Sequence, residues 1–316
     1  MLRALTLAAV TATLASGAAA GPRGGTAVVF VSAERASQLV GVDPATGRVL
    51  ARIRVPTGPH NVASYRERYV LVTSPPAGAV TLVDTFTRRV VRTWRGFGYP
   101  HDVEIAGDFA YVTDEARGEL VVIGLRARKV RARLAVGARP HDVAVGDVTL
   151  VTHGAGRASL TVVDTRRPAA PRVIGSLAAG GAAHDISRRA GAALAHVTYW
   201  GSGSVGAVDW RRERLRWRRA LGSLIHHVQV DPHGRRLFAT DHGTGQVFLL
   251  STRDGRVLRR LGECPGAHHV VPVGTAWVAV ACHDADALAV WNARTWRRTL
   301  VPVGDGPHGV AVAVLP

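Results

Sequence analysis

A histidine recurs along this chain every 40 to 43 residues, each time within a short segment of the same character. In Arg139–Val143, for example, a proline precedes the histidine and a valine follows it two positions later. The seven histidines are His60, His101, His141, His184, His226, His268 and His308. A period of about 40 residues built from short strands is typical of a β-propeller, in which each repeat forms one four-stranded blade. The spacing therefore predicts an all-β fold: a seven-bladed β-propeller with four antiparallel strands in each blade.

The sequence between successive histidines shows the same order of short apolar segments in each repeat. In the third repeat, residues 143–145 read as a first strand, 150–153 as a second strand and 160–164 as a third strand that ends in aspartate. Turns rich in glycine or serine separate such segments, because these residues readily adopt the backbone angles that tight turns need. Short β-branched runs bounded by turn residues favour strands over helices throughout.

The two ends of the chain are expected to complete one blade together. The seventh histidine is followed by a single strand segment, 310–314, and then the chain ends. Three unassigned strand segments stand near the other end, at 28–32, 39–43 and 49–53. Pairing the two ends would close the ring and leave no exposed strand edge to aggregate. The last blade is therefore predicted to be closed by both termini.

The strand motifs themselves resemble a known repeat family. Segments such as Tyr111–Asp114, read together with the proline–histidine turn and the Val-x-Val-x-Asp strand, resemble the units of the YVTN-type repeat β-propeller family. The resemblance covers nearly all of the chain after residue 20 and implies the propeller fold. It names no substrate, since members of this family include binding proteins, surface-layer-type proteins and a few enzymes. The chain departs from the family at the asparagine of the Tyr-Val-Thr-Asn motif, which is replaced by Ser74, Asp114, His153, Tyr199, Asp241 and Cys282.

Residues 1–20 are expected to be a secretory signal peptide. A short cationic start is followed by the apolar run Ala4–Leu14 and by the small residues Ala18–Ala20. This pattern is typical of a cleaved export signal, and the run is too short to span a bilayer. No later apolar stretch is long enough for a membrane span. The sequence thus predicts a periplasmic or secreted protein whose residues 21–316 form a single propeller domain.

The charge of the chain is strongly positive, at +17, yet its distribution argues against nucleic acid as a partner. Lys129 is the only lysine, so the basic residues are almost all arginine. Arginines gather in the fourth strand segment of the repeats, as in 211–219, which would lie at the outer rim of the disc. A solvated basic rim on a monomer is the favoured interpretation. Binding to an anionic surface or to a protein of the cell envelope is the alternative.

The segment that enters the first strand and the turn that leaves the second strand lie on the same face of a propeller. The seven histidines are therefore expected to ring the mouth of the central channel. Supporting residues expected at the same face are Asp102, Asp142, Asp185, His227, His269, His153 and His283.

Three interpretations of this histidine ring remain open. In the first, each imidazole bonds a neighbouring backbone group and was inherited by duplication. In the second, three or four of the imidazoles bind a copper or zinc ion, or the ring holds several ions, with the adjacent aspartates fixing the histidine tautomers. In the third, a tetrapyrrole is ligated by one histidine above the channel.

The two cysteines, Cys264 and Cys282, fall in one repeat and should be neighbours on the histidine face. An exported protein favours a disulfide between them. The alternative is a soft-metal site for Cu(I) or zinc that also uses His268 and His283. Three tryptophans, Trp200, Trp277 and Trp291, could stack on a ligand, although packing between blades is their commoner use.

The sequence as a whole predicts an exported propeller that binds a metal ion or a small molecule at its histidine-lined face. A propeller enzyme, either a metal-dependent oxidoreductase or a lyase with a histidine as general base, is the first alternative. No Gly-x-Ser-x-Gly motif of a serine hydrolase is present, so that class is disfavoured. A cell-envelope interaction scaffold is the second alternative.

Overall fold

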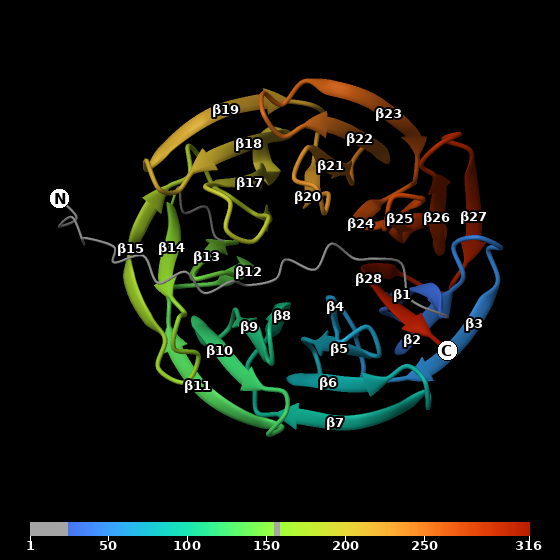
Figure 1. Cartoon of the computed structure of the whole chain (residues 1–316), viewed down its shortest axis with the longest axis horizontal. Helices are drawn as coiled ribbons and strands as arrows, with labels where there is room; N and C mark the ends of the chain where they lie inside the picture. The colour runs from blue at the N-terminus through green and yellow to red at the C-terminus, as the bar shows by residue number, and fades with distance from the viewer. Residues whose placement is uncertain (1–24, 155–158) are drawn as a thin grey trace.

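The structure, a computed structural model, describes residues 25–154 and 159–316. Within these residues, 28 strands form seven four-stranded antiparallel sheets, arranged as blades around one axis (Figure 1). The prediction of an all-β, seven-bladed propeller is confirmed. The predicted signal peptide, residues 1–20, lies outside the described part of the chain.

Six of the blades each come from one continuous stretch of chain, with the strands running in order from the axis to the rim. They are β4–β7 (Val62–Tyr65, Tyr69–Ser74, Ala79–Asp84, Arg89–Arg95), β8–β11 (Pro100–Ala106, Phe109–Asp114, Glu119–Gly124, Lys129–Ala135), β12–β15 (Pro140–Ala144, Val148–His153, Ser159–Asp164, Arg172–Ala178), β16–β19 (Ile186–Ser187, Leu194–Tyr199, Ser204–Asp209, Arg214–Ala220), β20–β23 (Ile225–Val230, Arg236–Asp241, Gln246–Ser251, Val257–Glu263) and β24–β27 (Ala267–Val273, Trp277–Cys282, Ala287–Asn292, Arg298–Pro302). Two 3-10 turns, η1 (Trp200–Ser202) and η2 (His283–Ala285), follow the second strands of their blades.

The seventh blade is built from both ends of the described chain. Its innermost strand is β28 (Pro307–Leu315), which pairs antiparallel with β1 (Thr26–Ala33). Strand β1 then pairs with β2 (Gln38–Val42), and β2 with β3 (Val49–Arg54). The first and last described strands therefore lie side by side and join the ring (Figure 1).

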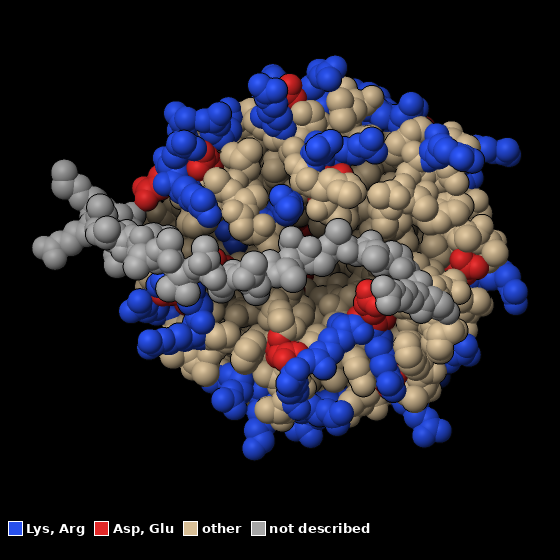
Figure 2. All heavy atoms as spheres, in the orientation of Figure 1, with Lys and Arg blue, Asp and Glu red and all other residues tan. Residues whose placement is uncertain are grey.

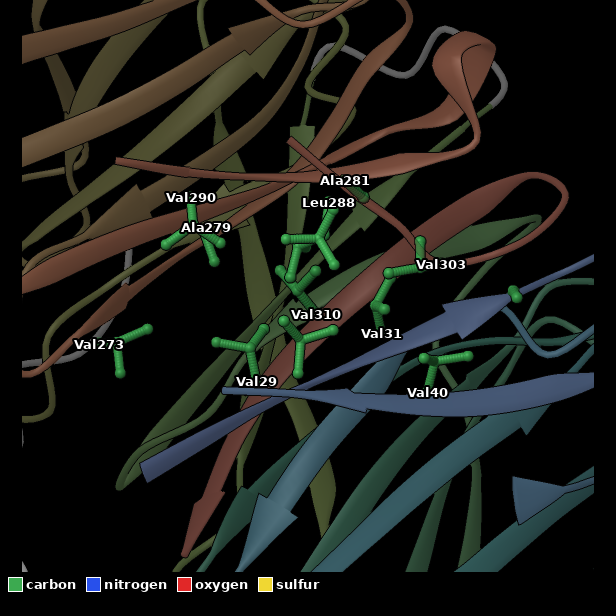
Figure 3. Close-up of a cluster of buried hydrophobic side chains, with 13 residues drawn as sticks. Val29, Val31, Val40, Val273, Ala279, Ala281, Leu288, Val290, Val303 and Val310 are labelled. Atoms are coloured by element: carbon green, nitrogen blue, oxygen red, sulfur yellow. The ribbon is translucent and has the colours of Figure 1, made fainter. Parts of the chain in front are cut away.

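The core lies between neighbouring blades. The two middle strands of a blade are buried on both faces, as in β6 and β18, where no residue is exposed. Figure 3 shows one such interface, where Val29 and Val31 of β1 pack with Ala279 and Leu288 of the preceding blade. Since each blade buries its faces only against its neighbours, the ring holds together as one unit.

The outermost strands are largely exposed and carry many of the arginines. In β19, for example, Arg214, Arg216 and Arg219 are exposed while Trp217 is half-buried. Figure 2 shows blue arginine and lysine side chains around the circumference of the visible face. The basic residues therefore form a solvated rim. Among the residues that the structure describes, no helix has the length and apolarity needed to cross a bilayer.

Candidate functional site

The structure brings the seven repeated histidines together at the channel mouth. Each one lies in the innermost strand of its blade or just before that strand. Their ring centroids are separated by 4.7 Å (His60–His101), 3.9 Å (His101–His141), 4.0 Å (His141–His184), 5.2 Å (His184–His226), 4.1 Å (His226–His268), 4.3 Å (His268–His308) and 3.6 Å (His308–His60). The imidazoles thus form a closed ring, called here the histidine ring.

A hydroxyl group from the second strand of each of several blades fixes the backbone of this ring. In each of these blades the hydroxyl belongs to a threonine. It donates a hydrogen bond to the backbone carbonyl oxygen of the ring histidine in the next blade. It also accepts a hydrogen bond from a backbone N–H in its own blade, that of the residue after the ring histidine. The donated bonds are Thr73–His101 at 2.8 Å, Thr113–His141 at 2.8 Å, Thr152–His184 at 2.6 Å and Thr198–His226 at 3.1 Å. Ser32 occupies this position in the blade formed by both termini. Adjacent blades are therefore tied together at each of these histidines.

Burial keeps most of these imidazoles uncharged. Burial and, secondly, repulsion from neighbouring imidazoles lower the pKa well below the usual histidine value in His101, His141, His226, His268 and His308. Burial also lowers the pKa of His184 to about 4. A neutral imidazole has a lone pair on one ring nitrogen, which is the form that binds a metal ion.

Three consecutive, buried members of the histidine ring converge on one point of the mouth. His226, His268 and His308 each offer a ring nitrogen within 4.8 Å of those of the other two. Among the described residues, the Nδ1 atom of each has no hydrogen-bond partner. Nitrogens bound about 2.0–2.1 Å from a tetrahedral zinc ion are about 3.3 Å apart, so small side-chain rotations would suffice to bind one ion. These three residues therefore fit a zinc or copper ion.

Two other members of the histidine ring have acidic neighbours that were not expected from the sequence. The Oε1 atom of Glu34 lies 3.4 Å from Nδ1 of His60, and that of Glu115 lies 3.8 Å from Nε2 of His141. The Nε2 atoms of His60 and His101 are 3.1 Å apart. His101, Glu115 and His141 form a second group with ligand atoms within 4.8 Å of one another.

These glutamates share a repeat position that the sequence does display. They stand two residues after the threonine or serine of the second strand. In the blade of His283 an alanine, Ala281, replaces that threonine or serine. The residues at this position, called here the outer ring, are Glu34, Pro75, Glu115, Gly154, Trp200, His242 and His283. Trp200 stacks on His184 with ring centroids 4.9 Å apart, and His242 lies 4.7 Å from His268. Alignment of the repeats would have revealed this shared position, although the residue type there differs from blade to blade.

The aspartates that follow the ring histidines have other partners than the sequence analysis expected. Asp102, Asp142 and Asp185 were expected to fix histidine tautomers. Instead their carboxylates accept backbone N–H groups of the next blade, from Val143 at 3.2 Å, Ile186 at 2.8 Å and Val228 at 3.1 Å respectively. Burial, with neighbouring carboxyl groups as a second cause in Asp102 and Asp142, raises the pKa of all three well above the usual value. They form an inner layer that ties the blades together.

Two histidines continue this inner layer. His227 accepts the N–H of Val270 on Nδ1 at 3.2 Å, and its ring lies 4.1 Å from that of His269. Asp185, His227 and His269 have side-chain atoms within 4.8 Å of one another. Because the Nδ1 of His227 is an acceptor, its proton is on Nε2, which leaves no lone pair for an ion on that nitrogen.

His153 and His283 differ from each other in position. Both ring nitrogens of His153 are bonded away from the mouth, to the carbonyl oxygen of Ala138 at 2.9 Å and to Thr161 at 2.8 Å. His153 therefore belongs to the packing of its blade, and its predicted place at the site is wrong for that physical reason. His283 lies in the outer ring, 5.0 Å from His268 between ring centroids, with Nδ1 bonded to Asp284.

The two cysteines form a disulfide, Cys264–Cys282, between the segment that leads into β24 and the end of β25. A disulfide sulfur is not a thiolate, so these residues offer no soft-metal ligand in this state. Of the tryptophans, Trp291 is fully buried with Nε1 bonded to Leu261, and Trp277 packs against a core cluster. Only Trp200 of the three lies against the histidine ring.

A cavity of about 310 Å³ opens over the part of the mouth that carries Glu115. Its walls combine imidazoles, one carboxylate, one guanidinium group and two larger aromatic rings. The lining residues are His60, Tyr99, His101, Glu115, Arg139, His141, Gly154, His184 and Trp200. The mouth can therefore hold a small ligand in contact with four of the ring histidines.

Comparisons with known proteins identify the architecture and no family. No family model matches the chain, and no curated protein matches it in sequence. The structure is similar to apo AztD from Citrobacter koseri, with a TM-score of 0.74 and 12% identity over 92% of this chain and 98% of that chain. A functionally unknown protein from Desulfotomaculum acetoxidans gives a TM-score of 0.75 and 16% identity over 90% and 98% of the two chains.

A third similar structure contains a ligand. The dihydro-heme d1 dehydrogenase NirN in complex with DHE gives a TM-score of 0.65 and 16% identity, over 90% of this chain and 74% of that chain. At these identities the likeness shows the seven-bladed fold alone. The expected membership of the YVTN-type family is not supported by any family model.

Proposed function

We propose that this protein is an exported propeller that binds one transition-metal ion at the mouth of its channel, with His226, His268 and His308 as ligands. The observation that carries the proposal is the convergence of three buried ring nitrogens within 4.8 Å. Burial lowers the pKa of all three imidazoles, so the metal does not have to compete with bound protons at neutral pH.

Zinc is the ion that this set of ligands suits best. Three imidazoles with a water molecule in the fourth position are a common zinc arrangement. Copper is the second choice, since imidazole also suits Cu(II). A tetrapyrrole fits less well, because the imidazoles are in contact around the mouth and a macrocycle would have to lie above them.

Export is part of this proposal. Residues 1–20 have the pattern of a cleaved signal peptide, and the Cys264–Cys282 disulfide suits an oxidising compartment such as the periplasm. Mass spectrometry of the protein recovered from a periplasmic or culture fraction tests this point. A mature chain that begins near Gly21 supports export, and a full-length chain found only in the cytoplasm contradicts it.

Metal binding is tested by calorimetric titration of zinc into the mature protein, purified without an affinity tag. We expect saturable binding that His268→Ala weakens by about 100-fold or more, since even loss of an outer-shell partner costs about 10–100-fold. His233→Ala is the matched control, because His233 is exposed in a turn. Absence of saturable binding, or equal affinity in His268→Ala and the wild type, overturns the proposal.

A further inference from the structure

A second group of metal-ligating side chains lies across the histidine ring from the first and shares no residue with it. His101, Glu115 and His141 each offer a ligand atom within 4.8 Å of the other two. The two imidazoles come from the innermost strands β8 and β12, and Glu115 comes from the turn that follows β9. Two histidines and one carboxylate are a ligand set of several zinc and non-haem iron sites.

The hydrogen bonding of His101 prepares it for this role. Its Nδ1 lies 3.0 Å from the carbonyl oxygen of His141, so this nitrogen carries the proton and donates. The Nε2 atom of the neutral ring is then an acceptor. It lies 3.1 Å from Nε2 of His60, whose N–H donates to this lone pair, so a bound metal ion would take the place of that proton. A backbone carbonyl that accepts the second N–H is the usual support of a metal-binding histidine.

Two side-chain nitrogens lie near the Glu115 carboxylate. One of its oxygens, Oε1, lies 3.8 Å from Nε2 of His141, and the other, Oε2, lies 3.8 Å from a guanidinium nitrogen of Arg139. Only 11% of the Glu115 side chain is exposed, whereas 61% of Arg139 is exposed. This largely buried carboxylate is therefore placed to bind a cation together with the two imidazoles.

The space beside these residues is kept open by a glycine. A Cβ atom placed on Gly154 would lie 3.0 Å from Cδ2 of His141 and 3.5 Å from Oε1 of Glu115. The cavity of about 310 Å³ begins at this point and includes all three candidate ligands in its walls. An ion bound by three protein ligands would therefore keep an open position toward the cavity.

We propose that His101, Glu115 and His141 form a second site for a divalent first-row metal ion, with its open coordination position facing the cavity beside Gly154. The carboxylate makes this site harder than the all-histidine site, so it accepts zinc, cobalt or ferrous iron and disfavours Cu(I). The inference does not depend on the first site, because each group has its own ligands.

The test is a titration of Co²⁺ alone into the mature protein, followed by the visible absorption of the bound ion and by calorimetry. We expect two ions per wild-type chain, one in Glu115→Gln, one in His268→Ala and none in the double variant. Glu119→Gln is the matched control, because Glu119 is on the next strand, β10, where it pairs with Arg133. That variant is expected to keep two ions.

A second variant protects the test against misfolding. Gly154→Ala places a methyl group against His141 and is expected to weaken the second site by about 10-fold or more, while the first site is unchanged. If the wild type binds a single ion that is lost in Glu115→Gln and kept in His268→Ala, the His101–Glu115–His141 site is supported and the His226–His268–His308 site is refuted. Equal cobalt stoichiometry in the wild type, Glu115→Gln and Gly154→Ala overturns the second site.

Discussion

The hydroxyl group of Thr113 donates a hydrogen bond to the carbonyl oxygen of His141, one blade further along the ring, at 2.8 Å. The hydroxyl oxygen of Thr113 in turn accepts the backbone N–H of Asp102 at 2.9 Å. One side chain thus fixes the backbone of two neighbouring members of the mouth. The backbone that carries these imidazoles is therefore fixed by hydrogen bonds between neighbouring blades.

Replacement of Thr113 by valine keeps the shape of the side chain and removes both bonds. Because a buried N–H group is left without an acceptor, we expect the free energy of unfolding to fall by about 1–3 kcal/mol. Urea unfolding followed by tryptophan fluorescence measures the change. Thr87→Val, in an exposed turn, is the control and should stay within about 0.5 kcal/mol of the wild type. Equal losses in the two variants would contradict the clamp.

Gly309, in β28, allows the blade built from both ends of the chain to approach the neighbouring blade, β4–β7. Its N–H lies 2.9 Å from Oγ of Ser32 and 3.1 Å from the carbonyl oxygen of His60, and an added Cβ would lie 2.5 Å from that oxygen. Gly309→Ala must therefore move backbone at the junction of β28 and β4, and we expect a loss of about 1–3 kcal/mol. Gly175→Ala is the control, because a Cβ there meets nothing within 4 Å. Thermal unfolding measures the loss. If Gly309→Ala has the same melting temperature as the wild type, the close approach of Gly309 to the carbonyl oxygen of His60 is contradicted.

Glu104 gives the fold a dependence on pH. Burial raises the pKa of its carboxyl to about 8, with Asp102 adding to the rise and Arg188 and the N–H of Val145 opposing it. The folded state therefore favours the neutral acid. The stability that this group contributes is complete below the usual pKa of 4.5 and is lost as the pH rises toward 8.

Comparison of Glu104→Gln with the wild type isolates this contribution. We expect the stability of the variant relative to the wild type to increase between pH 5 and pH 8, because the amide cannot ionise. Thermal unfolding at the two pH values measures the difference. Glu67→Gln, at an exposed position, should show no such change. If the relative stability of Glu104→Gln is the same at both pH values, the raised pKa is refuted.

The disulfide between Cys264 and Cys282 spans 18 residues and should stabilise its blade by about 3 kcal/mol. Unfolding of the wild type with and without reductant measures that contribution, and reductant should have no effect on the double variant Cys264→Ala, Cys282→Ala. We expect zinc affinity to be unchanged in this variant, because the sulfur atoms are not among the proposed ligands. Loss of zinc binding would favour the soft-metal site instead.

The blades and the histidine ring could be predicted from the sequence because one slot in each repeat holds the same residue type. In a propeller that slot lies at the channel mouth in every blade, so repetition along the chain becomes proximity in space. His153 shows the limit of this argument. It replaces the asparagine of the family motif, but its ring is bonded to Ala138 and Thr161 within the packing of its own blade.

The roles of the aspartates could not be predicted because they depend on a local irregularity of the strands. The pairing of β8 with β9 shifts its register between Pro100 and Val103, so His101 and Asp102 lie within a bulge. A bulge redirects side chains in a way that alternation along a strand does not show. As a result Asp102 reaches the N–H of Val143 in the next blade. The residue types of the outer ring vary, so Glu34 and Glu115 gave no repeated signal either.

The most direct test of the central claim is a crystal structure of the zinc-loaded protein with anomalous data recorded at the zinc absorption edge. We expect an anomalous peak about 2.0–2.1 Å from one ring nitrogen each of His226, His268 and His308. A structure from crystals grown in excess zinc that has no ion at these nitrogens, and that shows each imidazole bonded only to backbone groups, would contradict it.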